Sequence, residues 1–382
     1  MALKLCASAV MLCVSACASL PRAGFSATEA ADASPPGFAN VLFDEDSPVL
    51  VEGLRRDVHP DATHQLNVLA LSGGGANGAY GAGVLYGWSR AGDRPDFQVV
   101  TGVSVGALIA TFAFAGSAWD ERLRQAFDGA ETAHILKGRG VLGLITPGLF
   151  SKARLTSLVD RYVDEDLIRA VAAEHAKGRR LLVATTNLDS ERLVVWDMGA
   201  IAAHGGPEAR RLFQQVLVAS VGIPGIFSPS LISVETGGRR FSEMHVDGQV
   251  IAGFLAVFHS ILLADEPIAS REKLKLYVLV NGGLDGRFNV TVDQTIPVVA
   301  RSLEAGAKAA LRSELIATTD FCRRNGLELE ISQLTNVAQD RPLDFGEGHV
   351  HQLFEEGVAA SMAGSAWRTP DATPAIVASG SR

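Results

Sequence analysis

The sequence predicts an α/β fold with three α/β/α layers around a mostly parallel central sheet. Short apolar runs that suit buried strands alternate with segments of helical spacing, which is the pattern of parallel α/β domains. Two glycine-rich turns each join such an apolar run to a helical segment. The chain has 382 residues, 47% of them hydrophobic, which suffices for one large buried core.

The expected elements follow one another from residue 65 onward. Apolar runs predict strands at residues 65–72, 97–101, 180–186, 192–196, 240–246, 273–280 and 327–334. Helical spacing predicts helices at residues 79–90, 107–115, 212–220, 296–324 and 344–362. We therefore expect one domain at residues 65–365. Residues 366–382 are rich in Pro, Ala, Ser and Thr and predict a disordered tail.

The N-terminus is similar to a secretory signal of the bacterial lipoprotein type. Residues 1–16 combine Lys4 with an apolar stretch that is too short to span a bilayer as a helix. The stretch ends in Val14-Ser15-Ala16-Cys17, which resembles a lipobox, so Cys17 is the predicted lipidation site. Residues 17–64 show little periodicity and predict a tether and an N-terminal arm.

These features predict where the protein resides. A lipidated Cys17 would anchor the exported chain to a membrane. Ala18 follows the cysteine, where an Asp would suggest retention in the inner membrane. We therefore expect the outer membrane or periplasm of a Gram-negative bacterium. The alternative is an ordinary signal peptide that is cleaved near Ala16 or Ala18.

Charge and cysteine content limit the possible partners. The net charge of −8, with no long basic run, predicts that the protein does not bind nucleic acid. Cys322 would be the one cysteine left after processing if Cys17 is lipidated. Nothing around Cys322 resembles a reactive-cysteine motif, so we expect it to be packed inside a helix.

The strongest local motif is Gly102-Val103-Ser104-Val105-Gly106, which lies between a predicted strand and a predicted helix. In this setting G-x-S-x-G is typical of a nucleophile elbow, with Ser104 exposed at the helix N-terminus. Gly102 and Gly106 would permit the tight turn and the close packing of strand on helix. The alternative is a structural turn in which Ser104 caps the helix.

A second motif, Gly73-Gly74-Gly75-Ala76-Asn77-Gly78, also joins a strand to a helix. Gly73, Gly75 and Gly78 fit a dinucleotide fingerprint, but the acidic residue expected at the end of the second strand is missing there. The other interpretation is an oxyanion hole, because backbone N–H groups stabilise the oxyanion of acyl transfer. Neighbouring parallel strands would bring this loop beside Ser104.

A serine nucleophile needs a base, and Asp247 is the candidate. Asp247-Gly248 follows a predicted strand, which suggests that the carboxylate itself takes the serine proton. His245 is two residues away and shares a strand face with Asp247, so a triad is the alternative. Taken alone, Asp247-Gly248 would indicate only a turn.

Together these motifs resemble the patatin-like phospholipases. The resemblance covers G-G-G-x-x-G, G-x-S-x-G and D-G in that order, with supporting stretches at residues 184–188 and 219–229. It implies that Ser104 is the nucleophile, Asp247 the base, and Gly73, Gly74 and Gly75 the oxyanion loop. The implied reaction is hydrolysis of fatty-acyl esters of lipids or phospholipids, with no metal ion or organic cofactor.

The sequence departs from the family pattern at two places. Gln249 follows Asp247-Gly248, where family members usually have Gly or Ala, so the site could be narrower. Ala76 and Asn77 stand where many members have Arg or Lys, which puts preference for phospholipid in doubt more than ester hydrolysis. A lipoprotein that binds lipid or a partner without catalysis is the alternative, and residues 285–382 carry no recognisable motif.

Overall fold

The computed structural model describes residues 22–62, 64–129, 152–257, 273–286, 288, 290–336 and 340–370. It contains a central sheet in the order β1-β5-β4-β3-β2-β8-β9, and the hairpin β6–β7 joins the sheet through β4. The five strands from β4 to β9 in this order pair in parallel, whereas the remaining strands pair antiparallel. The predicted fold class, a three-layer α/β/α fold with a mostly parallel sheet, is confirmed.

The strands of the described residues are β1 (Leu42–Asp44), β2 (Gln65–Leu71), β3 (Val99–Val103), β4 (Arg180–Asn187), β5 (Arg192–Asp197), β6 (Ser230–Thr236), β7 (Arg239–Asp247), β8 (Lys273–Val280) and β9 (Glu328–Gln333). The α-helices are α2 (Ala27–Ala31), α3 (Pro48–Asp57), α4 (Gly78–Ala91), α5 (Val105–Ala115), α6 (Asp120–Phe127), α7 (Lys152–Tyr162), α8 (Glu165–His175), α9 (Met198–His204), α10 (Gly206–Ser220), α12 (Thr295–Asn325) and α13 (Glu347–Met362). The short 3₁₀ turn η1 (Gly75–Asn77) lies within the predicted glycine-rich loop, and η5 (Gly248–Val250) follows Asp247.

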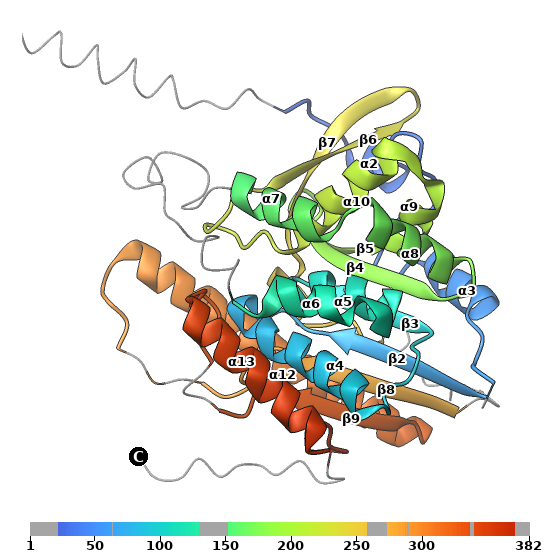
Figure 1. Ribbon diagram of the computed structural model, residues 1–382. Coiled ribbons are helices and arrows are strands. Elements are labelled where there is room, and N and C mark those ends of the chain that lie inside the picture. The colour runs from blue at the N-terminus through green and yellow to red at the C-terminus, as the bar shows by residue number, and fades with distance from the viewer. Residues whose placement is uncertain are drawn as a thin grey trace, which may run out of the picture.

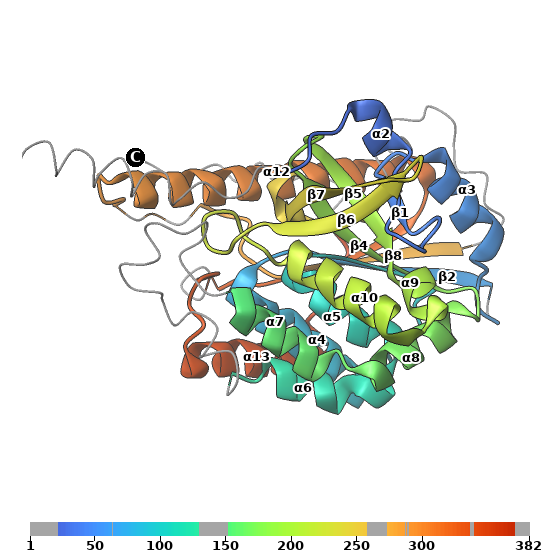
Figure 2. The ribbon, with the colours of Figure 1, turned by 90° about the horizontal axis from the view of Figure 1, so that it is seen from above.

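The two faces of the sheet are covered by different sets of helices (Figure 1). Alternate residues of a strand point to opposite faces, so Leu69 and Leu71 join the core beneath α4, α5 and α13. Val68 and Ala70 face the other way and pack with Leu311 of α12. Figure 2 shows α12 on the face opposite to α4, α5 and α10.

The N-terminal segment and the C-terminal boundary differ from the expected domain limits. β1 pairs with β5, and Leu50 of α3 is buried against the sheet, so part of the predicted arm belongs to the folded domain. Arg368 bridges Ile331, and Ala366 is buried, so the domain continues past residue 365. Both segments gain their order from pairing with distant strands, which local periodicity does not reveal.

Cys322 lies in the C-terminal part of α12 and is buried, as the sequence predicts. Desolvation raises the pKa of its thiol to about 12, which suits an inert core residue. The strand β6 was not expected from the sequence. Its residues alternate between buried and exposed, and it is held by pairing with β7.

Candidate active site

Ser104 occupies a sharp turn between β3 and α5. Its φ is 55°, a left-handed conformation that is unusual for a residue with a side chain, and its hydroxyl is held where the strand meets the helix. The turn requires small neighbours. A Cβ on Gly106 would lie 2.5 Å from the Leu71 carbonyl oxygen, and one on Gly102 would lie 2.5 Å from the Ala107 Cα.

The hydroxyl of Ser104 meets the carboxylate of Asp247. Ser104 Oγ donates a hydrogen bond of 2.6 Å to Asp247 Oδ2, and both side chains are buried. The other carboxylate oxygen, Oδ1, accepts the Gln249 N–H at 2.8 Å. Burial raises the pKa of Asp247 to about 7, and these two hydrogen bonds oppose the increase. The carboxylate is therefore poised to exchange a proton near neutral pH.

Asp247 is positioned by the strand that carries it. β7 pairs with the carboxyl end of β4, where Asp247 lies opposite Thr185. The Asp247 N–H donates to the Gly222 carbonyl at 3.1 Å. Gly248 then turns the chain past β4, where a Cβ would lie 2.7 Å from the Ala184 carbonyl oxygen. This close approach explains why a glycine follows the aspartate.

The glycine-rich loop lies beside Ser104 because β2 and β3 are neighbouring parallel strands. The Gly73 N–H donates to the Gly253 carbonyl at 3.1 Å, so Gly73 cannot offer this group to a substrate. Among the described residues, the N–H groups of Gly74 and Gly75 have no acceptor. Gly75 has a φ of 56°, which favours glycine, and Gly78 packs against Val105, which follows the serine.

His245 does not contact the pair. Its Nδ1 lies 3.0 Å from Thr185 Oγ1, and its Nε2 lies 3.3 Å from Glu243 Oε2. The side chain is fully buried and packs against Trp196. Both ring nitrogens are therefore occupied away from Ser104, and the geometry favours the Ser104–Asp247 pair over the alternative triad.

Asn77 and Gln249, which depart from the family pattern, both make defined contacts in the structure. Asn77 is buried, and its Nδ2 donates to Asp340 Oδ1 at 2.7 Å, so it ties the glycine-rich loop to the C-terminal region. Asp340 also pairs with Lys308 of α12. The side chain of Gln249 lies directly against Gly73, where a Cβ would be only 2.3 Å from Gln249 Oε1. Gln249 therefore narrows the site at the glycine-rich loop.

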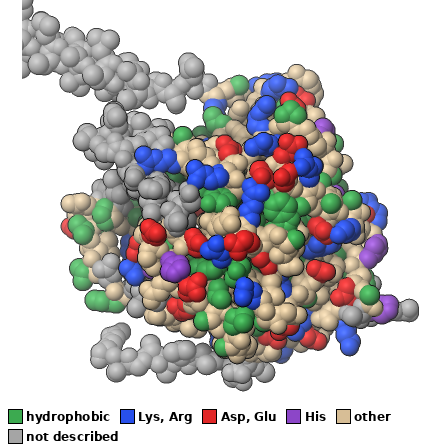
Figure 3. Space-filling view, in the orientation of Figure 1, with side chains coloured by type: hydrophobic (Ala, Val, Ile, Leu, Met, Phe, Trp, Pro, Cys, Tyr) green, Lys and Arg blue, Asp and Glu red, His purple; other side chains and the backbone are tan. Residues whose placement is uncertain are grey.

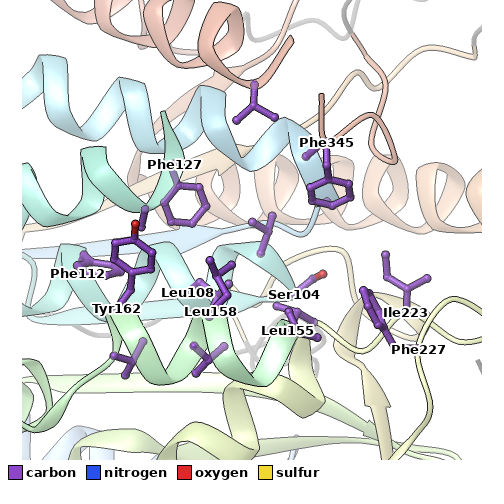
Figure 4. A pocket seen from close by; sticks show the side chains of 18 residues that line it. Ser104, Leu108, Phe112, Phe127, Leu155, Leu158, Tyr162, Ile223, Phe227 and Phe345 are labelled. Carbon is purple, nitrogen blue, oxygen red and sulfur yellow. The ribbon is translucent and has the colours of Figure 1, made fainter. Parts of the chain in front are cut away.

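An apolar pocket runs from Ser104 along α5 (Figure 4). It has room for about 80 Å³, and Ser104 and Tyr162 are the lining residues that carry a hydroxyl group. Its walls are made by side chains from α5, α6, α7 and the segment after α10, among them Leu108, Phe112, Phe127, Leu155, Leu158, Tyr162 and Phe227. Ser104 and Phe112 are eight residues apart, or about 12 Å along a helix.

A second, wider cleft opens on the other side of the pair. It has room for about 840 Å³ and is lined by Asp247, Gln249 and the glycines of the loop at residues 73–75. The opposite wall comes from residues 282–311 and 340–344, which include polar and charged side chains. The serine–aspartate pair thus lies between a narrow apolar pocket and a wide, mixed cleft.

Three further residues support the site, the buried Ser220 and Asn281 and the half-buried Glu314, and none of them was predicted as a site residue from the sequence. Ser220 Oγ accepts the Ser104 N–H at 3.0 Å and donates to the Ala184 carbonyl at 2.8 Å. Asn281 Nδ2 donates to the Ser72 carbonyl at 2.7 Å, just before the glycine-rich loop. The Glu314 carboxylate accepts the Gly253 N–H at 2.9 Å. Ser220 lies in the stretch at residues 219–229 that resembles the family, but its role depends on contacts with residues distant in sequence, as do the roles of Asn281 and Glu314.

The signal segment that the sequence predicts, membrane-spanning helices and metal sites concern the chain outside the active site. Residues 1–16 and Cys17 lie outside the described residues. None of the helices that the structure describes is both long and apolar enough to cross a bilayer. Within the same described ranges, no cluster of His, Cys, Asp and Glu side chains is arranged to hold a metal ion.

A serine on a sharp turn, a buried carboxylate and backbone N–H groups beside an apolar pocket form an arrangement that can carry out acyl transfer. The model of the family "Patatin-like phospholipase" matches residues 69–256, a range that contains Ser104, Asp247 and the glycine-rich loop. The chain therefore carries a patatin-like phospholipase domain at residues 69–256.

Two solved structures are similar to this chain. VipD from Legionella pneumophila matches with a TM-score of 0.37 and 12% identity, over 82% of this chain and 68% of VipD. The type III effector protein ExoU matches with a TM-score of 0.30 and 13% identity, over 80% of this chain. The match covers 54% of ExoU, so the chain spans about half of that protein. No curated protein sequence matches the chain.

Proposed function

We propose that this protein is a serine acyl hydrolase that cleaves fatty-acyl esters of phospholipids or lysophospholipids with a Ser104–Asp247 dyad. One observation carries the proposal: Ser104 Oγ donates a 2.6 Å hydrogen bond to Asp247 at the mouth of an apolar pocket. The pair is buried, so the carboxylate has lost the water that would otherwise compete for the serine proton.

In the acylation step Ser104 Oγ attacks the ester carbonyl carbon while Asp247 Oδ2 takes the serine proton. The carbonyl π electrons move to the oxygen, and the N–H groups of Gly74 and Gly75 stabilise the resulting oxyanion. When the oxyanion collapses, the bond to the alcohol oxygen breaks and Asp247 returns the proton to that oxygen. The alcohol leaves, and the acyl group remains on Ser104.

Deacylation repeats these events with water. Asp247 takes a proton from a water molecule, whose oxygen attacks the acyl carbon, and the second oxyanion uses the same N–H groups. Collapse breaks the bond to Ser104 Oγ, which regains the proton from Asp247. The fatty acid is released, and the dyad returns to its starting state. A pKa of about 7 for Asp247 suits a group that must both accept and return a proton.

The shapes of the two spaces support the substrate assignment. The narrow pocket is apolar along its length, which suits an acyl chain. The wide cleft offers charged and polar side chains beside Asp247, which suits the alcohol part of a lipid, including a head group. This division fits phospholipase A or lysophospholipase activity, in which a bulky polar alcohol leaves and a single chain stays on the enzyme.

A covalent probe and a substrate panel test the proposal. A fluorophosphonate should label wild-type protein and fail to label Ser104→Ala. Fatty acid release from phosphatidylcholine, lysophosphatidylcholine and p-nitrophenyl esters should require Ser104. If folded wild-type protein neither reacts with the probe nor releases fatty acid from any of these, a non-catalytic lipid-binding protein becomes the better assignment.

We also propose that the chain is exported and anchored through a lipidated Cys17, in the outer membrane or periplasm of a Gram-negative bacterium. The support is the signal-like stretch that ends in Val14-Ser15-Ala16-Cys17. Mass spectrometry of the mature N-terminus should find acyl chains on Cys17, and Cys17→Ser should abolish them. A mature chain that begins near residue 19 without lipid would contradict the anchor.

A further inference from the structure

α12 consists of two halves that differ in burial. From Leu311 onward it packs against the sheet through Leu311, Leu315 and Phe321. Between Pro297 and Ala310, by contrast, no side chain is buried. Figure 2 shows this half projecting beyond the elements that form the core. The projecting half is therefore not packed into the protein's hydrophobic core.

The projecting half and the segment before it expose large apolar side chains. We name these six the apolar rim: Phe288, Val290, Val292, Val298, Val299 and Leu303. Phe288 is 92% exposed and Val290 is 78% exposed. Hydrophobic side chains are visible on the projecting helix in Figure 3, at the left of the view. A cluster of this kind at one place marks an interaction surface rather than scattered surface residues.

Two basic side chains near the apolar rim are paired with carboxylates. Arg301 Nη1 lies 2.8 Å from Glu304 Oε2, one turn apart on the helix. Lys308, at the base of the projecting half, pairs with the buried Asp340. Asp293, which is exposed beside Val292, adds one negative charge. The six side chains of the apolar rim present hydrocarbon, and a single carboxylate beside them is too little charge to select an oppositely charged protein surface.

The apolar rim is continuous with the catalytic cleft. Val290, Val292 and Leu303 are exposed to solvent and also line the cleft that contains Asp247 and the glycine-rich loop. A molecule that leaves a surface docked on the apolar rim would thus enter the cleft without crossing water. This continuity indicates that a lipid surface binds the apolar rim, because the substrate of the proposed reaction resides in such a surface.

We propose that the apolar rim is a lipid-docking surface that places the mouth of the cleft against a bilayer, an inference that rests on the proposed function. Phe and Val side chains enter the boundary between head groups and acyl chains, as they do in interfacial helices. The docking adds to any N-terminal anchor because it orients the catalytic domain, whereas a tether alone holds the domain near the membrane without orientation.

The test compares vesicle binding with turnover of a soluble ester. All variants of the full chain carry Cys17→Ser, so that a lipid on this residue cannot contribute. Phe288→Asp with Val299→Asp alters the apolar rim at two positions that do not line the cleft. Ile316→Asp is the matched control, because Ile316 is 66% exposed on the other half of the same helix. Binding is measured by co-sedimentation with phosphatidylcholine vesicles.

We expect the rim variant to bind vesicles at least about tenfold more weakly than the parent, because two apolar side chains lose their burial in lipid. Release of fatty acid from vesicles should fall with binding, while p-nitrophenyl butyrate turnover stays unchanged. The Ile316→Asp control should bind like the parent. Should the double variant fail to hydrolyse the butyrate ester, Phe288→Ser, at a nearly fully exposed position, repeats the comparison.

Three outcomes would overturn the proposal. The rim variant could bind vesicles as well as the parent, or the control could lose binding to the same extent. Alternatively, the parent could be a dimer in solution that the rim variant converts to a monomer, which would assign the apolar rim to a second copy of the chain. Loss of butyrate turnover in the parent would count against the proposed function alone, because vesicle binding is measured without it.

Discussion

The apolar pocket, which Ser104 lines, and the wide cleft, which Asp247 lines, differ in size, polarity and origin. The apolar pocket is narrow, with room for about 80 Å³, and most of its walls come from residues within the family match at 69–256. The cleft has room for about 840 Å³, and much of its wall comes from residues 282–344, beyond that match. The acyl side is thus built by the shared domain, whereas the alcohol side is built largely by this chain's own C-terminal region.

This difference suggests how the proposed specificity is divided. A pocket walled by α5, α6 and α7 can measure an acyl chain, because its side chains are fixed in the core. A wide cleft selects the alcohol part of the substrate less strictly by shape, and its selectivity depends on a few polar contacts near the reacting bond. Substitutions in the two spaces should therefore change different parts of the substrate profile, while substitutions at the dyad should affect all substrates.

The largest loss of activity is expected from substitution of the dyad, because every substrate reacts there whichever groups occupy the pocket and the cleft. Asp247→Asn keeps the size of the side chain but cannot accept the Ser104 proton. Turnover of short and long esters should fall together, by about 10³–10⁴-fold. Steady-state kinetics with p-nitrophenyl butyrate and palmitate measure the loss. A fall confined to one chain length would show that Asp247 acts on substrate binding instead.

The next effect separates the apolar pocket from the cleft. Leu108 lines the pocket one helical turn beyond Ser104, so Leu108→Trp should block it. Long-chain esters should lose on the order of 100-fold in kcat/KM, whereas acetate esters should lose little, because the acyl tail alone needs the space. Leu108→Met conserves the volume and serves as the control. Equal losses for acetate and palmitate would contradict the acyl-pocket assignment.

The sequence predicted what depends on local pattern. The buried strands and long helices were found because their periodicity is written in consecutive residues, as in β2 and α4. Ser104 and Asp247 were selected because each stands where a predicted strand ends. The parallel pairing of β2 and β3 brings Ser104 beside the glycine-rich loop, whereas Asp247 arrives through the antiparallel pairing of β7 with the carboxyl end of β4. The order of the three motifs along the chain was informative because each motif stands at the end of a predicted strand.

The remaining features depend on contacts between residues that are far apart in the sequence. β1 is held by β5, and β6 by β7, so neither is recognisable alone. Ser220, Asn281 and Glu314 act on loops more than 60 residues away. The occupation of the Gly73 N–H by Gly253 was equally hidden, since it depends on the path of the chain after Asp247.

A pH profile sharpens the assignment of Asp247. The base must be ionised, and its pKa is raised to about 7, so activity should decline below pH 7 by about tenfold per pH unit. The stability effect has the opposite sign. The native state binds this proton more tightly than the unfolded state, so the contribution of Asp247 to stability is lost as pH rises from about 4 to 7.

Asp247→Asn removes this proton linkage. Relative to wild type, the variant should therefore gain stability between pH 4 and pH 8, by up to about 4 kcal/mol. Urea denaturation at the two pH values measures the difference. An equal effect of the substitution at both would show that the folded protein does not raise the pKa of this carboxyl group.

A smaller effect is expected on the cleft side. Gln249 presses against Gly73, so Gln249→Gly should widen the cleft beside the glycine-rich loop. Bulky alcohols should gain about five- to tenfold relative to small ones, while the acyl-chain profile stays unchanged. Gln249→Leu keeps most of the volume and should preserve the original ratio. Competition between phosphatidylcholine and a methyl ester of the same fatty acid gives the ratio directly.

The smallest change in activity is expected from Glu314, whose hydrogen bonds connect α12 to the glycine-rich loop. Glu314 of α12 accepts the N–H groups of Gly253 and Phe254, and the Gly253 carbonyl in turn accepts the Gly73 N–H. Burial raises the pKa of Glu314 to about 7, so at pH 8 the carboxylate is mostly ionised and accepts both bonds strongly. Glu314→Gln weakens these bonds and should let the glycine-rich loop shift. We expect kcat to fall severalfold with KM unchanged, equally for butyrate and palmitate, because the oxyanion donors serve every ester. A loss seen only with palmitate would instead connect α12 to the apolar pocket, and the two spaces would no longer be independent.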